Sequence, residues 1–196
     1  MLKTEKLKLV SEWDKTFPQS EKVDHKKVTF VNRYGITLAA DLYKPKNASG
    51  KYPAIAVSGP FGAVKEQCSG LYAQTMAERG YLTIAFDPSF TGESGGYPRF
   101  MASPDINTED FMAAVDFLSV REDVDPDKIG IIGICGWGGM ALNAAALDTR
   151  IKVTVASTMY DMTRVNANGY FDSEDSEEAR YAKKQVTEYP QDRRIP

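Results

Sequence analysis

The sequence has 196 residues, a formal net charge of −3, 42% hydrophobic residues and 26% charged residues. This is ordinary globular composition, and the chain is long enough to bury one sizeable core, so we expect a single domain. The sequence contains no Lys/Arg-rich block. The charge pattern therefore argues against binding to nucleic acid or to an anionic membrane, and neither is expected as a partner.

The first twenty residues are rich in Lys and Glu and contain no apolar run long enough for a signal peptide or a membrane span. We therefore expect a cytoplasmic protein. The two cysteines, Cys68 and Cys135, are too few for a disulfide framework, and the single histidine, His25, leaves no spacing typical of a zinc site. We expect neither a metal nor a cofactor.

In chain order, residues 27–34 and 36–43 alternate in hydrophobicity on either side of Gly35 and predict an antiparallel hairpin. Continuous apolar runs at 54–57 and 81–86 predict strands that are buried on both faces of a parallel sheet.

A helix is predicted over residues 70–79, between these two buried strands, and Gly80 is a good left-handed terminator for it. One face of this helix gathers Leu71, Tyr72, Thr75 and Met76. The three elements together predict a crossover between neighbouring parallel strands.

The next helix is predicted to begin with Asn107 as its N-cap and Asp110 at its third position. Its apolar residues follow at helical spacing: Phe111, Met112, Val115 and Leu118. Residues 128–134 then predict another buried strand. A glycine-rich corner leads from it into a helix ending at Leu147, and Ile151–Ser157 predicts a further strand.

This alternation predicts a doubly wound, mostly parallel α/β sheet with an antiparallel hairpin at its N-terminal end. Residues 1–26 are interpreted as an N-terminal extension, 27–160 as the α/β core, and 161–196 as a lid-like helical segment followed by a tail. The last segment is first acidic and then basic, so we expect a solvated surface helix, with part of a substrate lid as the alternative.

Residues 133–139 (GICGWGG) stand where a buried strand turns sharply into a helix. A nucleophile elbow requires such a corner, because small residues let strand and helix pack closely while the nucleophile stands exposed. A thiol at Cys135 would face the helix N-terminus, whose unpaired N–H groups and positive dipole end favour the thiolate. The alternative is a buried, inert cysteine. Cys68 lacks this context and is expected to pack or to lie in a loop.

The corner also predicts an oxyanion hole. Its first donor is expected to be the backbone N–H of Gly136, directly after the nucleophile. The second is expected in the loop after an earlier strand, where residues 59–62 (GPFG) end the strand, and we assign it to the N–H of Phe61. Pro60 and Trp137 are expected to line the substrate pocket.

These motifs resemble the dienelactone hydrolase-like branch of the α/β-hydrolases, together with related bacterial peptidase- and esterase-like members. The resemblance is carried by the order and spacing of four segments: 59–62, 87–94, 124–130 and 133–139. It implies an α/β-hydrolase fold. It also implies that Cys135 attacks the acyl carbon of a small carboxylic ester or lactone, and that an acid and a histidine complete the triad.

Two positions depart from the family pattern. The family elbow usually has a small residue two positions after the nucleophile, where this chain has Trp137, so the helix approaches the sheet differently or the indole points into the pocket. In dienelactone hydrolase a glutamate two residues before the Phe-Gly pair helps to activate the thiol, and this chain has Gly59 there. Glu66 is an alternative carboxylate, although a surface or loop role is favoured for it.

Triad members in this fold follow the order nucleophile, acid, histidine, and no histidine follows Cys135 in the sequence. Asp161 is a candidate acid, with a capping or turn role as the alternative. His25 is expected to be a satisfied or solvated surface residue. Because the family sheet continues past Ile151–Ser157, we expect the C-terminal strands to be missing and this strand to be an edge that invites self-association or a complementary chain.

The leading hypothesis is therefore a cysteine hydrolase whose base lies outside this sequence. A non-catalytic binding or regulatory protein that keeps the fold is the alternative, and a redox-sensing thiol at Cys135 is a third. Dinucleotide binding is disfavoured, because residues 133–139 lack the G-x-G-x-x-G register and no suitable acidic residue follows about twenty residues on.

Overall fold

The computed structural model describes residues 5–46, 49–159 and 161–188. Contacts divide the chain into two compact units, Met1–Met159 and Tyr160–Pro196, and each is described by itself. No helix in the described ranges is both long enough and apolar enough to cross a bilayer.

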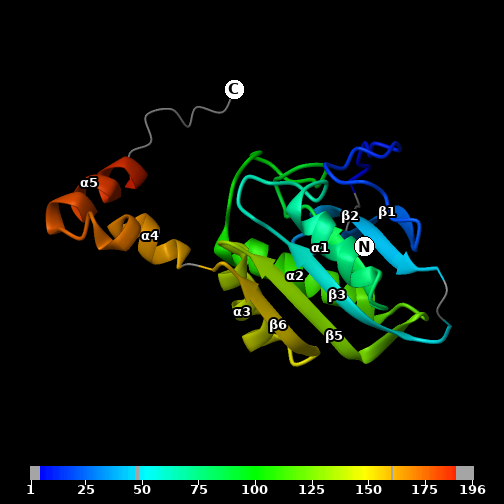
Figure 1. The fold of residues 1–196 in the computed structure, drawn as a ribbon. Helices are drawn as coiled ribbons and strands as arrows, with labels where there is room; N and C mark the ends of the chain where they lie inside the picture. Colours follow the sequence, from blue (N-terminus) through cyan, green and yellow to red (C-terminus); the bar gives the residue numbers. More distant parts are fainter. Residues whose placement is uncertain (1–4, 47–48, 160, 189–196) are drawn as a thin grey trace. The chain divides into compact units, whose positions relative to one another are not determined.

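The first unit is built on a mixed sheet (Figure 1). Its strands, in the order in which they lie side by side, are β1 (Val23–Val31), β2 (Thr37–Pro45), β4 (Leu82–Phe86), β3 (Tyr52–Ser58), β5 (Val124–Ile134) and β6 (Ile151–Ser157). Strands β1 and β2 form the expected antiparallel hairpin, and β2 also runs antiparallel to β4. The pairs of β3 with β4, β3 with β5 and β5 with β6 are parallel.

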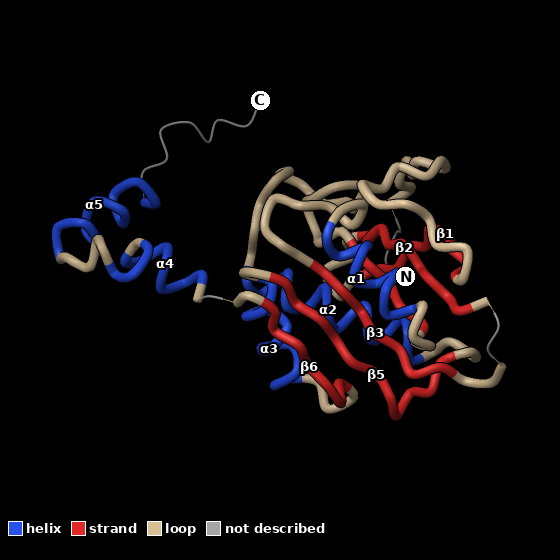
Figure 2. Tube along the Cα trace, viewed as in Figure 1, coloured by secondary structure: helices blue, strands red, loops and turns tan. Residues whose placement is uncertain are grey.

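Helices cover the two faces of this sheet (Figure 2). Helix α1 (Cys68–Ala77) packs mainly on β2, β3 and β4, whereas α2 (Pro104–Ser119) and α3 (Trp137–Leu147) pack against each other and on β5. Two separate clusters of buried apolar side chains lie between the helices and the sheet. The prediction of a doubly wound, mostly parallel α/β fold with an N-terminal hairpin is confirmed.

The buried face of α1 is not the one predicted. Leu71 and Tyr72 are 47% and 41% exposed. The buried residues of the helix are small or polar: Ser69, Gly70, Ala73, Gln74 and Ala77. Position 70 has no room for a side chain, because a Cβ atom there would lie 2.2 Å from the carbonyl oxygen of Lys65 in the loop before the helix. Helix α1 therefore packs through its small residues.

The prediction of Asn107 as an N-cap is also wrong, because α2 begins one turn earlier. Ser103 is the N-cap and Pro104 occupies the first helical position, where a proline is well tolerated. The Asn107 side chain accepts a hydrogen bond from the Ser103 N–H at 2.8 Å and donates to Asp110 at 3.0 Å. Asn107 thus supports the cap from inside the helix.

The N-terminal segment runs against the body of the first unit. The Phe17 side chain is buried, and the Trp13 indole donates to its carbonyl oxygen at 2.9 Å. The Ser20 N–H donates to Gln74 on α1 at 3.1 Å. Strand β1 begins at Val23, so the expected boundary after residue 26 falls inside a strand.

The second unit contains α4 (Met162–Asn168), a 3₁₀ turn (Tyr170–Asp172) and α5 (Glu177–Glu188). Arg164 and Asp172 join the first two through a bidentate ion pair at 2.6 and 2.8 Å. No residue of α4 is buried. The predicted tail lies outside the described residues.

Candidate active site

Cys135 occupies a backbone conformation that few residues other than glycine adopt. Strand β5 ends at Ile134 and α3 begins at Trp137, so the turn between them consists of Cys135 and Gly136. The φ angle of Cys135 is +59°, in the left-handed region. Its N–H donates to the Ser157 carbonyl on β6 at 2.8 Å, and its own carbonyl accepts the Gly138 N–H at 2.9 Å. The surrounding structure therefore holds a strained residue in place, which is typical of a functional turn.

The glycine before this turn allows the strand and the helix to meet. A Cβ atom at position 133 would lie 2.3 Å from the Trp137 carbonyl oxygen and 2.8 Å from the Ala141 side chain. Any side chain at Gly133 would push α3 away from β5. The elbow geometry that the motif predicts is present, including the close packing that the small residue permits.

The Cys135 side chain lies at the border of the core. The residue is half-buried, carries a free thiol, and packs at the edge of the apolar cluster that includes Ile132 and Ile134. It is neither sealed in the interior nor projecting freely. Cys68, the other free cysteine, is also half-buried, and burial raises the pKa of its thiol, which disfavours the reactive thiolate.

Two backbone N–H groups near this turn have no acceptor in the described part of the chain. One belongs to Gly136, the N-cap residue of α3, and the other to Phe61 in the loop after β3. The helix N-terminus adds the positive end of its dipole to the first of them. Amides without partners are the groups that can receive a developing negative charge on a ligand.

A cleft of about 240 Å³ opens between the loop after β3, the loop after β4 and the start of α3. Pro60, Phe61 and Trp137 line it, as expected of Pro60 and Trp137. The other lining side chains are mainly apolar or small: Ala63, Val64, Pro88, Thr91, Phe100, Met101 and Ala102, with Arg99 as the charged member. Cys135 does not line this cleft and lies at the turn directly before Trp137.

One contact accounts for both departures from the family pattern. A Cβ atom at position 59 would lie 2.7 Å from Cδ1 and 2.9 Å from Cβ of Trp137, and 2.4 Å from the Ile134 carbonyl oxygen. The indole of Trp137 stacks on Phe61 with ring centroids 5.3 Å apart. Trp137 therefore fills the space above Gly59, and a side chain at position 59 is incompatible with it.

His25 and Asp161 lie in local interactions of their own. The His25 ring is 2.8 Å from the buried carboxylate of Asp41 on the neighbouring strand. Strands β2, β4 and β3 separate β1 from β5, and the register places His25 level with Gly130, before the end of β5. His25 therefore lies more than about 19 Å from the elbow at the usual spacing of strands. Asp161 belongs to the second unit, where its carboxylate caps α4 by accepting the Arg164 N–H at 3.0 Å.

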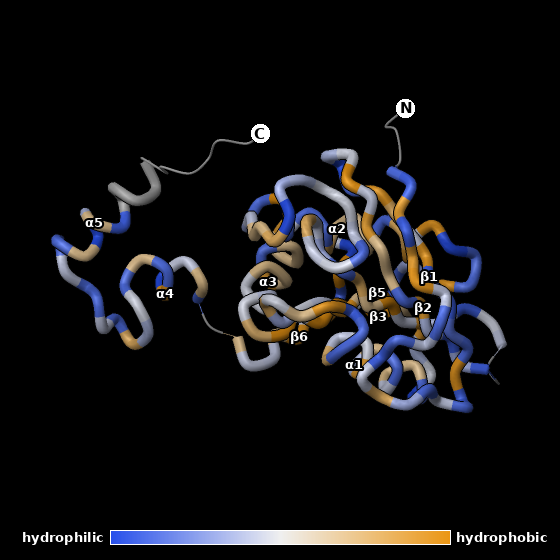
Figure 3. The backbone as a smooth tube through the Cα atoms, turned by 90° about the horizontal axis from the view of Figure 1, so that it is seen from above, coloured by the Kyte–Doolittle hydropathy of each residue, from blue (hydrophilic) through white to orange (hydrophobic). Residues whose placement is uncertain are grey.

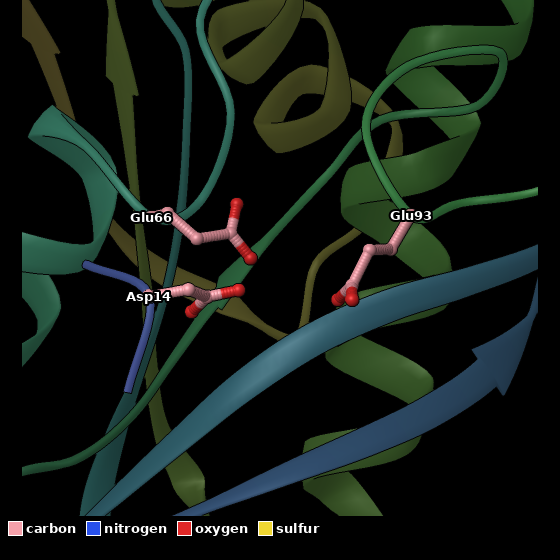
Figure 4. A group of neighbouring side chains, drawn as sticks. All are labelled: Asp14, Glu66 and Glu93. Carbon is pink, nitrogen blue, oxygen red and sulfur yellow. The ribbon is translucent and has the colours of Figure 1, made fainter. Parts of the chain in front are cut away.

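Asp14, Glu66 and Glu93 bring carboxylates from three segments together (Figure 4). Their oxygens approach within 4.8 Å of one another, as in a metal site. The Lys27 ammonium, however, contacts all three, at 3.3 Å from Asp14, 3.5 Å from Glu66 and 2.7 Å from Glu93. A protein cation therefore already occupies the position that a metal ion would take, and the cluster is an ion-pair network.

Lys65 extends this network into the interior and ties together the loops that line the cleft. Its side chain is fully buried, and its ammonium contacts Glu66 at 2.5 Å, Glu93 at 2.7 Å and Asp87 at 2.8 Å. Burial opposes the charge, but these carboxylates raise the pKa of Lys65 above its usual value. Glu66 is part of this structural network and lies in a loop, in agreement with the surface or loop role favoured from the sequence.

Asp87 joins the two cleft loops directly. One carboxylate oxygen accepts the backbone N–H of Lys65 at 2.8 Å, and the other accepts the backbone N–H of Glu93 at 2.9 Å. Gly92 must lack a side chain, because a Cβ atom there would lie 2.2 Å from this carboxylate. Sequence reasoning missed Lys65 and Asp87 as residues that organise the cleft. The signals for Asp87 were its position directly after a buried strand and its place in segment 87–94, which carries part of the family resemblance.

The comparisons with known proteins agree with this architecture. Residues 34–195 match the family model described as X-Pro dipeptidyl-peptidase (S15 family). The chain belongs to this family. Membership of the S15 family and the shared fold confirm the expected place among the α/β-hydrolases.

Three proteins illustrate the likeness. PA2218 of Pseudomonas aeruginosa is 72% identical over 168 residues, which are 85% of this chain and 45% of that protein. Its crystal structure superposes with a TM-score of 0.92 and 65% identity over 96% of this chain and 59% of that chain. The thiohydrolase aneE of Aspergillus aculeatus is 33% identical over 70% of this chain and 42% of that protein.

The third is the α/β hydrolase GrgF of Penicillium, which shares the fold alone, with a TM-score of 0.65 and 22% identity over 86% of this chain and 66% of that chain. The chain spans less than half the length of the two curated relatives described above.

Proposed function

We propose that this chain carries the nucleophile of a thiol-dependent hydrolase, and that Cys135 attacks the acyl carbon of small carboxylic esters, lactones or thioesters. The observation that carries the proposal is the strained backbone of Cys135 at the corner between β5 and α3, where φ is +59°. A non-glycine residue persists in this conformation only where the fold over-determines it, and such residues cluster at functional turns.

The proposed reaction begins with the Cys135 thiolate. Its sulfur forms a bond to the carbonyl carbon, and the carbonyl oxygen becomes an oxyanion that the N–H groups of Gly136 and Phe61 receive. The tetrahedral adduct then collapses, the bond to the alcohol or thiol leaving group breaks, and the leaving group takes a proton. The product is an acyl thioester on Cys135, which water hydrolyses to a carboxylic acid and the free thiol.

The cleft supports a small and mainly apolar substrate. Its volume of about 240 Å³ is below the usual range of 300–1,000 Å³ for ligand pockets. Phe61 and Trp137 present aromatic surface, and Arg99 is the one charged residue that lines it. The thiohydrolase among the relatives supports acyl thioesters as part of the substrate class.

Release of the acyl group needs a base that activates water. No histidine follows Cys135 in the sequence, and His25 is engaged with Asp41 at the far side of the sheet. We therefore expect this chain alone to form the acyl thioester readily and to hydrolyse it slowly. In the longer relatives the base is expected from the part of the protein outside the matched region.

The proposal is tested by incubating the chain with p-nitrophenyl acetate and measuring the intact mass, followed by peptide mapping. We expect one acetyl group per chain, located on Cys135. Cys68→Ala is the matched control, because it also removes a half-buried free thiol. The Cys68→Ala variant should be acylated like the parent chain, and Cys135→Ala should not.

Acylation at Cys68, or equal acylation of both variants, would show that Cys135 has no special reactivity. The complete absence of an adduct in a folded chain would reject the hydrolase proposal and favour a binding protein that retains the fold. Folding is checked for each variant by its circular dichroism spectrum and its thermal unfolding.

A further inference from the structure

Arg99 is the one charged residue that lines the cleft beside the Cys135 corner. The sheet below the cleft is hydrophobic: Figure 3 shows the most hydrophobic stretches of the first unit along its strands. Polar groups therefore reach the cleft from the loops at the ends of the strands. The loop that carries Arg99 follows β4, an inner strand that pairs with β2 on one side and with β3 on the other.

Backbone carbonyls of the same loop hold the Arg99 guanidinium. Its Nη1 donates to the carbonyls of Ser94 and Gly96 at 2.5 and 3.4 Å, and its Nη2 donates to the Gly92 carbonyl at 2.7 Å. A guanidinium has five N–H donors, so the Nε–H and one N–H of Nη2 have no acceptor in the described part of the chain. Nε and Nη2 share one edge of the planar group, and such an edge binds a carboxylate through two parallel hydrogen bonds.

The positive charge of Arg99 is not neutralised by its own loop. The carbonyls that hold the guanidinium are neutral, and the loop contains only two acidic residues, Asp87 and Glu93. The Lys65 ammonium contacts these two carboxylates at 2.8 and 2.7 Å, and Lys27 contacts Glu93 at 2.7 Å. Both acids are therefore already paired with lysines. The residues that line the cleft include no acidic side chain.

The other polar groups near this cleft are also electropositive. The N–H groups of Gly136 and Phe61 have no acceptor among the described residues, and the N-terminus of α3 adds the positive end of its dipole. Apolar walls with a low dielectric constant strengthen the field of these groups and of Arg99. The cleft therefore favours a ligand that carries negative charge in addition to its reacting carbonyl.

We infer that Arg99 binds a carboxylate of the substrate, so that the cleft selects small esters or thioesters that carry one anionic group. This inference rests on the proposed function, because it concerns the substrate of the same site. The apolar lining of the cleft contacts the carbon chain, and Arg99 donates charge-assisted hydrogen bonds to the carboxylate. The recognising chemistry is the same whether the carboxylate belongs to the acyl group or to the leaving group.

The test measures the rate at which two matched pairs of probes acylate Cys135, by intact mass and peptide mapping. In the acyl pair, mono-p-nitrophenyl adipate carries the carboxylate and p-nitrophenyl methyl adipate is its neutral counterpart. In the leaving-group pair, p-carboxyphenyl acetate is compared with its methyl ester. The anionic preference is the ratio of the two rates within a pair, corrected for hydrolysis without protein. The pair whose preference depends on Arg99 identifies the part of the substrate that carries the carboxylate.

Arg99→Met should lower the anionic preference roughly tenfold in one of the two pairs, the loss expected for hydrogen bonds to a charged group. A purely structural effect on the loop would slow both members of a pair alike and leave their ratio unchanged. Arg99→Lys keeps the charge and should retain part of the preference.

Lys128→Met is the matched control, because it removes one positive charge from a 67% exposed side chain near the start of β5, whereas Cys135 follows its end. This variant should keep the preference of the parent chain. An unchanged ratio in Arg99→Met for both pairs would overturn the inference, and so would an equal loss in Lys128→Met, while acylation of Cys135 would still support the proposed function. A folded chain that no probe acylates at Cys135 would reject both proposals.

Discussion

At the scale of single residues, the corner around Cys135 depends on the absence of side chains. Gly133 admits the backbone of Trp137, and Gly59 admits its indole. Both glycines are required by atoms of one neighbouring tryptophan. The residue two positions after the nucleophile is small in related elbows. It can be large here because Trp137 occupies the space that a side chain at position 59 would otherwise fill.

Gly59 gives a quantitative test of this packing. Gly59→Ala should lower the free energy of unfolding by more than about 2 kcal/mol, because alanine combines a φ of +102° with atoms 2.4 and 2.7 Å from its Cβ. Gly62→Ala is the matched control, since its φ is +74° and nothing lies within 4 Å. Gly62→Ala should lower the free energy of unfolding by only about 1 kcal/mol. Urea unfolding of both variants measures the difference, and equal costs would contradict the packing account.

The role of Cys135 as the elbow residue could be predicted from the sequence because the evidence is local. A buried strand, a glycine-rich corner and a helix follow one another within residues 128–147, and small residues in such a corner have a direct geometric meaning. The contact of Gly59 with Trp137 could not be predicted in the same way. This contact joins residues far apart in the chain. Whether it stabilises or destabilises the fold depends on distances of a few tenths of an ångström.

At the scale of elements, Lys65 and Asp87 hold the loop after β3 and the loop after β4 in one arrangement. Asp87 accepts a backbone N–H from each loop, and the Lys65 ammonium neutralises it. Both side chains are fully buried. The two loops supply most of the cleft lining, so the shape of the cleft follows from this pair. A charged residue is ordinarily expected at the surface, so the sequence favoured no such role for Lys65.

Lys65→Met tests the importance of this pair. Methionine has a similar length but leaves Asp87 buried without its cation, so unfolding should become easier by about 3–5 kcal/mol. Lys128→Met is the control, because the Lys128 side chain is 67% exposed and its pairing with Asp125 is worth at most about 1 kcal/mol. Denaturant unfolding of the two variants provides the comparison. A loss at Lys65 no larger than that at Lys128 would contradict the structural role of the network.

Strands were predicted more reliably than helix boundaries, for a physical reason. The runs at 54–57 and 81–86 are apolar throughout because both of their faces are covered, and the structure places them in β3 and β4. The start of α2 was misplaced because Ser103 and Asn107 are both good capping residues one turn apart. Only the tertiary structure distinguishes the residue that caps from the residue that supports it.

At the scale of the whole molecule, the described chain combines a strained strand-to-helix corner at Cys135 with a mixed, mostly parallel sheet. The mostly parallel α/β sheet with its N-terminal hairpin follows from the alternation of elements, and this architecture was predicted. The base of the proposed reaction could not be predicted, because no histidine follows Cys135 in the sequence and the curated relatives extend well beyond the matched region. The proposed chemistry therefore separates into acylation by this chain and a slow second step.

The pre-steady-state release of p-nitrophenolate from p-nitrophenyl acetate tests this separation most directly. The account predicts a burst of about one equivalent per folded chain, followed by slow turnover, because acylation precedes a step that lacks its base. The burst should disappear in Cys135→Ala and persist in Cys68→Ala. A linear time course without a burst, or a burst that survives in Cys135→Ala, would contradict the assignment of Cys135 as the nucleophile.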